Sequence, residues 1–143
     1  EISACLVGSE MCIRDSVQVN AAGDLSLRGG FVDSDGVVKP WPIGVVNPNN
    51  KLEVVKIYEI SDGAIATSGT YERGAHIHDP QTGMIAIGAK SASVVGPLGW
   101  LCDAMATAVM VGGTDSVSWF GQDELLGYQV FGVNRHEESA WEI

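Results

Sequence analysis

The fold class is decided by one continuous stretch, AKSASVVGPLGWLCDAMATAVMVGG, which runs from Ala89 to Gly113. Its first part, AKSASVVG, ends in a valine pair and a Gly-Pro step, which is typical of a strand that stops at a turn. Its second part changes to Ala, Leu and Met and ends in a glycine pair. This change predicts one main helix over about residues 98–112, with glycine as its stop signal.

The sequence on both sides of this stretch favours short strands joined by turns. VQVNAAGDLSLRGG alternates from Val17 and turns at Ala22-Gly23, which predicts a hairpin. Further strands are predicted for WPIGVVNP, KLEVVKIYEI, AIATSGTYE and GYQVFGV, with a shorter helix over 115–120 and a polar, partly frayed end at NRHEESAWEI. Many strands in series with one or two helices indicate an α+β fold with a mostly antiparallel sheet.

Composition bounds the size and the partners of the protein. The chain has 143 residues, of which 45% are hydrophobic, so it suits one domain with a real core. Its net charge is −10 and it has only 8 Lys and Arg residues, which argues against nucleic acid as a partner. An anionic ligand would therefore need a metal ion, a helix N-terminus or backbone amides to hold it.

The first sixteen residues, EISACLVGSEMCIRDS, differ in character from the rest. They lack the basic start and long apolar stretch of a signal peptide. They resemble the translated adapter read-through found at the ends of metagenomic fragments. We therefore expect residues 1–16 to be a non-native leader and residues 17–143 to form the domain. Without the leader, Cys102 is the only cysteine, so neither a disulfide framework nor a cysteine-rich metal site is expected.

Two oxygen-bearing side chains in the predicted helix could hold a metal ion. Asp103 and Thr107 are four residues apart and therefore project from nearly the same face. A carboxylate and a hydroxyl are the kind of ligands that Mg²⁺ uses alongside substrate phosphates. The alternative is that Asp103 is an acid favoured by the helix dipole and Thr107 bonds a backbone carbonyl. The face expected to pack on the sheet consists of Leu98, Leu101, Met105 and Ala108.

A second candidate site is AHIHDPQTG, Ala75 to Gly83, with two of the three histidines. One interpretation is zinc, which would need further ligands, and the only other histidine is His136 in the polar tail. Another is acid–base work, in which His76 or His78 takes a proton and Asp79 orients it or an incoming hydroxyl. The third is a polar hairpin without catalytic function.

A third candidate is ATSGTYER, Ala66 to Arg73. Small hydroxyl residues beside Gly69 can let the backbone approach a ligand, although they also make ordinary strand ends. Ser68 is not part of a Gly-x-Ser-x-Gly elbow, so a serine hydrolase has little support.

The order of these blocks carries more information than any block alone. NAAGDLSLRG, ATSGTYER, HIHDPQTG, SASVVGP and CDAMATAVMVGG follow one another as in the FAD:protein FMN transferases, the ApbE family, which this sequence resembles over Val17 to about Gly113. The family reads approximately Asn-Ala-Gly-Gly-Asp, Ala-Thr-Ser-Gly-x-Tyr, His-x-Ile-Asp-Pro-x-Thr-Gly, a Ser-Val-Thr-Val strand and Ala-Asp-Ala-x-x-Thr-Ala.

The resemblance implies an activity. Such proteins bind FAD and Mg²⁺ and transfer FMN to a Ser or Thr hydroxyl of an acceptor flavoprotein, such as an electron-transport subunit, with release of AMP. Some members instead hydrolyse FAD to FMN and AMP, so an FAD pyrophosphatase is the alternative, followed by a non-catalytic flavin-binding module. The match is to the family's C-terminal half, so we expect residues 17–143 to need an upstream half for catalysis. That half would also carry any membrane anchor, and the family suggests the bacterial cell envelope.

The resemblance also implies roles for single residues. Asp103 and Thr107 match the family's Mg²⁺ ligands, and His76 matches its motif histidine, the best candidate to accept a proton. Asp79 matches the aspartate of that motif and is expected to orient the loop.

The remaining matches concern the flavin side. Ser68, Gly69 and Tyr71 are expected to shape the cofactor pocket. His78 is placed with them as the less important histidine, because it stands where the family has Ile, Leu or Val. Asp24 matches the aspartate of the Gly-Gly-Asp block and is expected to be structural.

Overall fold

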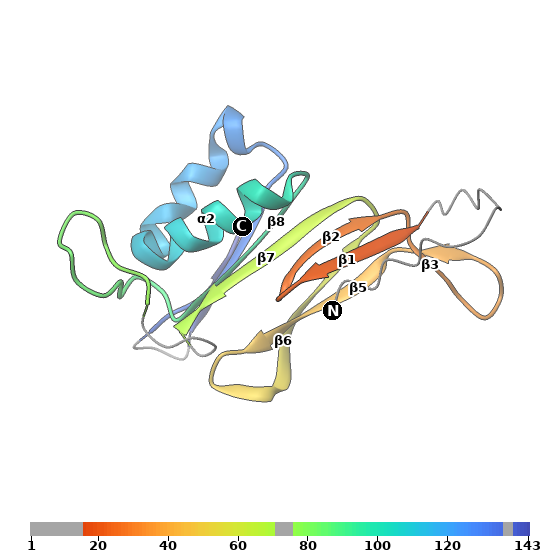
Figure 1. Cartoon of the computed structure of the whole chain (residues 1–143), viewed down its shortest axis with the longest axis horizontal. Helices are drawn as coiled ribbons and strands as arrows, with labels where there is room; N and C mark the ends of the chain where they lie inside the picture. The colour runs from red at the N-terminus through yellow and green to blue at the C-terminus, as the bar shows by residue number, and fades with distance from the viewer. Residues whose placement is uncertain (1–15, 71–75, 136–138) are drawn as a thin grey trace.

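The structure is a computed structural model that describes residues 16–70, 76–135 and 139–143. Its main element is a six-stranded antiparallel sheet (Figure 1). The strands follow the order β1 (Val17–Ala21), β2 (Asp24–Arg28), β7 (Gly63–Gly69), β8 (Ser91–Gly96), β9 (Gln129–Val133) and β10 (Ala140–Glu142). The predicted α+β class with a mostly antiparallel sheet is therefore confirmed. The predicted leader lies outside the described residues, except for its last residue, Ser16.

Two hairpins complete the β-structure. The short pair is β3 (Phe31–Val32) with β4 (Val38–Lys39), and the long pair is β5 (Trp41–Asn47) with β6 (Asn50–Ile60). The first hairpin of the main sheet, β1 with β2, turns at Ala22-Gly23 as predicted, and both turn residues have positive φ angles of 56° and 112°.

The helix α2 (Gly99–Gly112) packs on β7 and β8, and 3₁₀ segments η1 (Gly113–Gly121) and η2 (Asp123–Leu125) follow it. The predicted helix over 98–112 is thus confirmed, and the predicted short helix lies inside η1. The face predicted to pack on the sheet is wrong in part, because Leu98 is 47% exposed and precedes the helix. The buried helix residues are Cys102, Ala106, Val109 and Met110.

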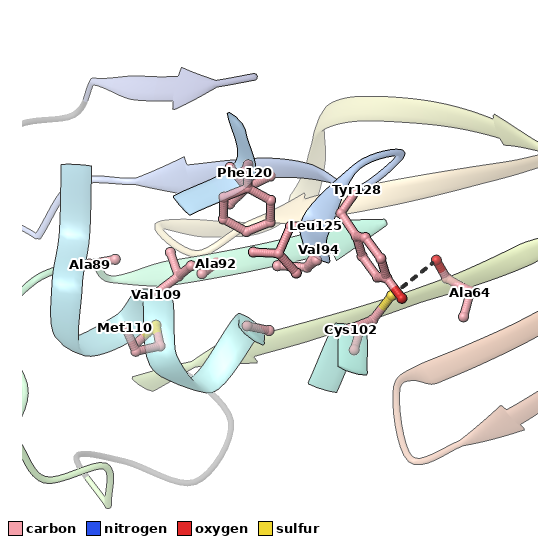
Figure 2. Packing of buried hydrophobic residues seen from close by; sticks show 13 residues of the cluster. Ala64, Ala89, Ala92, Val94, Cys102, Val109, Met110, Phe120, Leu125 and Tyr128 are labelled. Carbon is pink, nitrogen blue, oxygen red and sulfur yellow. Dashed lines mark hydrogen bonds between the residues drawn. The ribbon is translucent and has the colours of Figure 1, made fainter. Parts of the chain in front are cut away.

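The strand alternation divides the core into two layers. Residues on the helix side of β7, β8 and β9 join the buried face of α2, and Figure 2 shows this cluster around Met110, Val94 and Phe120. Small side chains on β7, Ala64 and Ala66, leave room for the helix to lie close to the strand. The cluster consists of Ala64, Ala66, Ala89, Ala92, Val94, Cys102, Ala106, Val109, Met110, Phe120, Leu125, Tyr128 and Val130.

The opposite face of the sheet is covered by the long hairpin. Ile65 of β7 and Phe131 of β9 alternate with the helix-side residues and pack against Tyr58 and Ile60 of β6. Burial, together with the nearby Glu142 carboxylate, raises the pKa of Tyr58 to about 12. The sheet is therefore a central layer between α2 on one side and β5–β6 on the other (Figure 1).

The end of the chain is more ordered than the sequence predicts. Residues 140–142 form β10, which pairs with β9, a strand that the prediction of a partly frayed end did not include. Gly132 makes the pairing possible, because a side chain there would overlap the indole of Trp141. Lys56 Nζ also lies 2.5 Å from Glu142 Oε2, which ties β10 to the long hairpin.

No helix among the described residues combines the length and the apolar character that crossing a membrane requires.

Candidate functional site

The structure brings two predicted site residues into direct contact where the end of β7 meets α2. The hydroxyl oxygens of Ser68 and Thr107 lie 3.1 Å apart and share a hydrogen bond. Ser68 faces the helix because it follows the buried Ala64 and Ala66 at the two-residue period of the strand. Thr107 lies on the exposed side of α2, next to the buried Ala106. A residue assigned to the flavin pocket is therefore bonded to one assigned to the metal.

Asp103 lies one helical turn before Thr107 and is also exposed. It lines a hollow of about 220 Å³ between α2 and the β1–β2 hairpin, together with Trp100 and Asp24. Asp24, which was expected to be structural, is a residue that sequence reasoning did not place beside Asp103. The alternation along β2 is the signal that could have identified it, because Asp24 falls on the same face as Ser26, whose partner Ala64 is buried under the helix.

The donor set at this place suits a hard cation. The carboxylate of Asp103 and the hydroxyl of Thr107 offer only oxygen, which matches Mg²⁺ rather than a softer transition metal. Both side chains lie on the exposed face of α2, so neither is blocked by the core. Within the described residues no group of three or more His, Cys, Asp or Glu side chains could hold a metal ion, so Asp103 and Thr107 would supply only part of a coordination shell.

The loop after β7 is organised by Asp79. One carboxylate oxygen accepts a hydrogen bond from the backbone N–H of Gln81 at 2.8 Å, and the other accepts one from the Thr82 hydroxyl at 3.0 Å. The Asp79 carbonyl also accepts the N–H of Gly83 at 2.8 Å, where φ is 71°. Both carboxylate oxygens are therefore engaged within the turn, which agrees with a role in orienting the loop.

The two histidines of this loop are both exposed. Nδ1 of His78 lies 3.2 Å from the carbonyl oxygen of His76, and His78 pairs with Ile85 across the turn. His78 is thus engaged with the backbone of its own loop. The third histidine, His136, lies outside the described residues, as does Tyr71.

The segment over residues 76–90, which carries both histidines, is anchored against the C-terminal end of α2 (Figure 1). The N–H of Ala89 donates to the carbonyl of Met110 at 3.2 Å, and Ile77 packs against the helix-side core. Gly88 lies directly against the helix end, because a Cβ atom there would be 2.6 Å from the backbone nitrogen of Gly113. The loop and the Asp103–Thr107 face are consequently attached to the same helix.

Cys102 is a core residue of α2 that faces β7. Its side chain is fully buried and its thiol donates to the Ala64 carbonyl at 3.7 Å (Figure 2). Burial raises the pKa of the thiol to about 11. A thiol that stays neutral is a poor nucleophile and a poor metal ligand, so Cys102 acts here as a small core residue.

A larger hollow of about 590 Å³ lies at the opposite end of β7 and β8. It is lined by residues of β6, the β6–β7 turn and the end of β8, and it includes none of the predicted site residues. Its carboxylates, Glu59 and Asp62, have no basic residue beside them in the lining, which makes it a poor place for a phosphate.

Comparison with known proteins agrees with the family resemblance of the sequence. A model of the ApbE family matches residues 12–131. The chain belongs to the ApbE family. A relative described as an FAD:protein FMN transferase from Rhodobacter capsulatus is 36% identical over 112 residues, which is 72% of this chain and 20% of that protein.

Solved structures of the family have the same fold. The ApbE protein of Thermotoga maritima is 31% identical, with a TM-score of 0.68, and the match covers 82% of this chain and 40% of that one. The flavin transferase ApbE of Vibrio cholerae is 28% identical, with a TM-score of 0.67, over 88% of this chain and 41% of that one. The chain thus spans less than half the length of these relatives.

Proposed function

We propose that this chain is the part of an Mg²⁺-dependent FAD:protein FMN transferase that holds the metal and supplies the proton acceptor. The observation that carries the proposal is the contact of Ser68 with Thr107, one turn from Asp103, in a chain of the ApbE family. An acidic protein with few Lys and Arg residues needs a cation to hold a pyrophosphate, and this face of α2 offers its ligands.

In the proposed reaction, the hydroxyl of a Thr or Ser in the acceptor flavoprotein attacks the phosphorus of the FMN half of FAD. A new P–O bond to the acceptor forms, the pyrophosphate P–O bond breaks and AMP leaves. Mg²⁺, when bound by Asp103 and Thr107, neutralises charge that develops on the phosphate oxygens. His76 accepts the proton of the attacking hydroxyl. Asp79 holds the turn that carries His76, through its bonds to Gln81 and Thr82.

The flavin side of the proposed site is formed by the end of β7 and the segment after it. Gly69 pairs with Ser91 at the last position of the strand, where the lack of a side chain allows close approach of a ring. Tyr71 belongs to the proposed flavin side through the family pattern, and His78 is placed there with it although it departs from that pattern. Ser68 takes a different position, because its hydroxyl is directed to Thr107.

The experiment combines FAD, Mg²⁺ and an acceptor protein containing the target Thr with two enzymes. One is the 143-residue chain, and the other is a chimera in which it replaces the matched 41% of the Vibrio cholerae transferase. Intact-mass analysis should show the gain of one FMN on the acceptor and formation of AMP in the chimera. Free FMN and AMP without acceptor labelling would indicate an FAD pyrophosphatase. Retained flavin without turnover, in a chimera that unfolds cooperatively, would indicate a binding module.

Two further parts of the proposal rest on the family resemblance. The acceptor is an electron-transport flavoprotein subunit or a similar protein, and the location is the bacterial cell envelope, reached through a segment upstream of Val17. Fractionation of cells that express the longer protein, followed by detection of covalently bound flavin in acceptor proteins, tests both.

A further inference from the structure

We infer that Ser68 is a positioning residue for the metal ligand Thr107, rather than a residue of the flavin pocket. The inference rests on the proposed function, because it concerns the same metal. It begins with one distance, the 3.1 Å between Ser68 Oγ and Thr107 Oγ1.

The strand fixes Ser68 before any ligand is present. Ser68 pairs with Ala92 in the β7–β8 ladder, one position before the strand ends. On the opposite face, the neighbouring Thr67 hydroxyl lies 2.8 Å from that of Ser93, a residue that is 1% exposed. The backbone of β7 is therefore held from two sides at the position where Ser68 projects towards the helix.

The turn of α2 that carries Thr107 is also held in place against β7. Ala106 is fully buried next to Thr107, and Cys102 one turn earlier donates to the carbonyl of Ala64 on β7. These small contacts bring α2 close enough that the short side chain of Ser68 spans the remaining gap. A longer residue at Ala64 or Ala66 would move the helix away and break the contact.

The hydrogen bond gives Thr107 one defined orientation. A threonine in a helix otherwise divides between rotamers, one of which bonds its hydroxyl to the carbonyl of the preceding turn. When the Thr107 oxygen gives a lone pair to a cation, its O–H must find an acceptor, and Ser68 Oγ is the one in contact. Partners of this kind fix ligand orientation, and their removal typically lowers metal affinity about 10- to 100-fold.

The test measures metal binding and needs no turnover. The chain has a mass of 15.1 kDa, which suits NMR, and NMR detects the weak binding expected of a partial site. Mg²⁺ is titrated into the ¹⁵N- and methyl-labelled chain, and the shifts of Thr107 and Asp103 give its Kd. Mn²⁺ then maps the same place by line broadening. The wild-type chain should respond at these two residues, and Asp103→Ala should lose the response.

Ser68→Ala should weaken Mg²⁺ binding about tenfold, and Ser68→Thr, which keeps a hydroxyl, should restore the affinity to within about twofold. The matched control is Ser93→Ala, which removes the hydroxyl pair between β7 and β8 on the far face of the sheet. It should leave the affinity unchanged, whatever it does to stability.

The outcomes separate the two proposals. If the wild-type chain shows no response at Asp103 and Thr107, or if Asp103→Ala binds as well as wild type, the metal assignment is wrong, and the role of Ser68 with it. If Asp103→Ala abolishes binding but Ser68→Ala binds like wild type, only the role of Ser68 is overturned. An equal loss in Ser68→Ala and Ser93→Ala would also overturn it, because strand damage would then explain both.

Discussion

Replacing Gly96 by alanine should destabilise the protein by about 2 kcal/mol, through one specific clash. Gly96 ends β8 and pairs with Ala64, and the buried ring of Tyr128 lies over its Cα atom. A Cβ atom there would overlap that ring, with Cγ only 2.8 Å away. Overpacking of this kind costs about 1–3 kcal/mol, and an overlap with the buried Tyr128 ring belongs at the upper end of that range. The lower entropy of alanine in the unfolded chain offsets about 0.4–1 kcal/mol, which leaves a net loss near 2 kcal/mol.

Urea unfolding followed by circular dichroism measures this loss. The control is Gly121→Ala, where a Cβ atom would meet nothing within 4 Å, and its free energy of unfolding should stay within about 0.5 kcal/mol of wild type. The clash itself is tested in a Tyr128→Leu background, in which Gly96→Ala should cost much less than in the wild type. An equal cost in both backgrounds, or a neutral Gly96→Ala, would refute this account of how the strand and the segment after η2 pack.

Three further predictions concern the site and its support. Asp103→Ala should abolish Mg²⁺-dependent flavin transfer in the chimera, yet change the free energy of unfolding by less than about 0.5 kcal/mol, because the residue is exposed; unchanged activity would remove Asp103 from the site. Asp79→Ala should free the Gln81 amide and the Thr82 hydroxyl, seen as faster hydrogen exchange at Gln81, and persisting protection there would contradict the assigned bonds. Burial raises the pKa of Cys102 from 9.0 to about 11, which favours the neutral thiol in the folded state. The resulting contribution of this thiol to the free energy of unfolding is complete below pH 9 and is lost between pH 9 and 11. Urea unfolding at pH 8 and pH 10 should therefore show a larger drop for wild type than for Cys102→Ala, and identical drops would show that burial does not perturb this thiol.

Much of the fold could be predicted because local signals and tertiary structure agree along most of the chain. The alternation from Val17, the turn at Ala22-Gly23 and the glycine pair after residue 111 each determine a short-range feature, and each is found in the structure. The pairing of β1 with β2 also follows, since a two-residue turn joins them, whereas the long segments between β2 and β7 and between β8 and β9 leave those pairings to tertiary structure.

The errors arise where a long-range contact decides. Leu101 and Met105 pack against the core as expected, but they are only partly buried, because the contact of α2 with β7 is made by the smaller Cys102 and Ala106. The polar segment before Ile143 was expected to be partly frayed. Its last residues form β10 instead, because Gly132 on β9 leaves room for the indole of Trp141, and the polar sequence of the segment does not indicate this pairing.

The candidate site shows the same division between local and long-range information. The four-residue spacing of Asp103 and Thr107 could be read from the sequence, because it depends only on the helical period. That Asp24 lines the same hollow as Asp103 depends on how a hairpin some eighty residues earlier is placed against the helix, and no local period contains that information.

The role of Ser68 follows from the way one strand serves both packing and chemistry. Ala64 and Ala66 are buried under α2, and Ser68 is the next residue on the same face, where the strand leaves the core. The alternation that places two methyl groups against the helix therefore places a hydroxyl at the first position where solvent and ligand can enter. Because the alanines set the distance between strand and helix, the Ser68–Thr107 bond is a consequence of core packing. Changes at Ala66 should thus alter the orientation of Thr107, the proposed metal ligand, through the spacing of α2 and β7 alone.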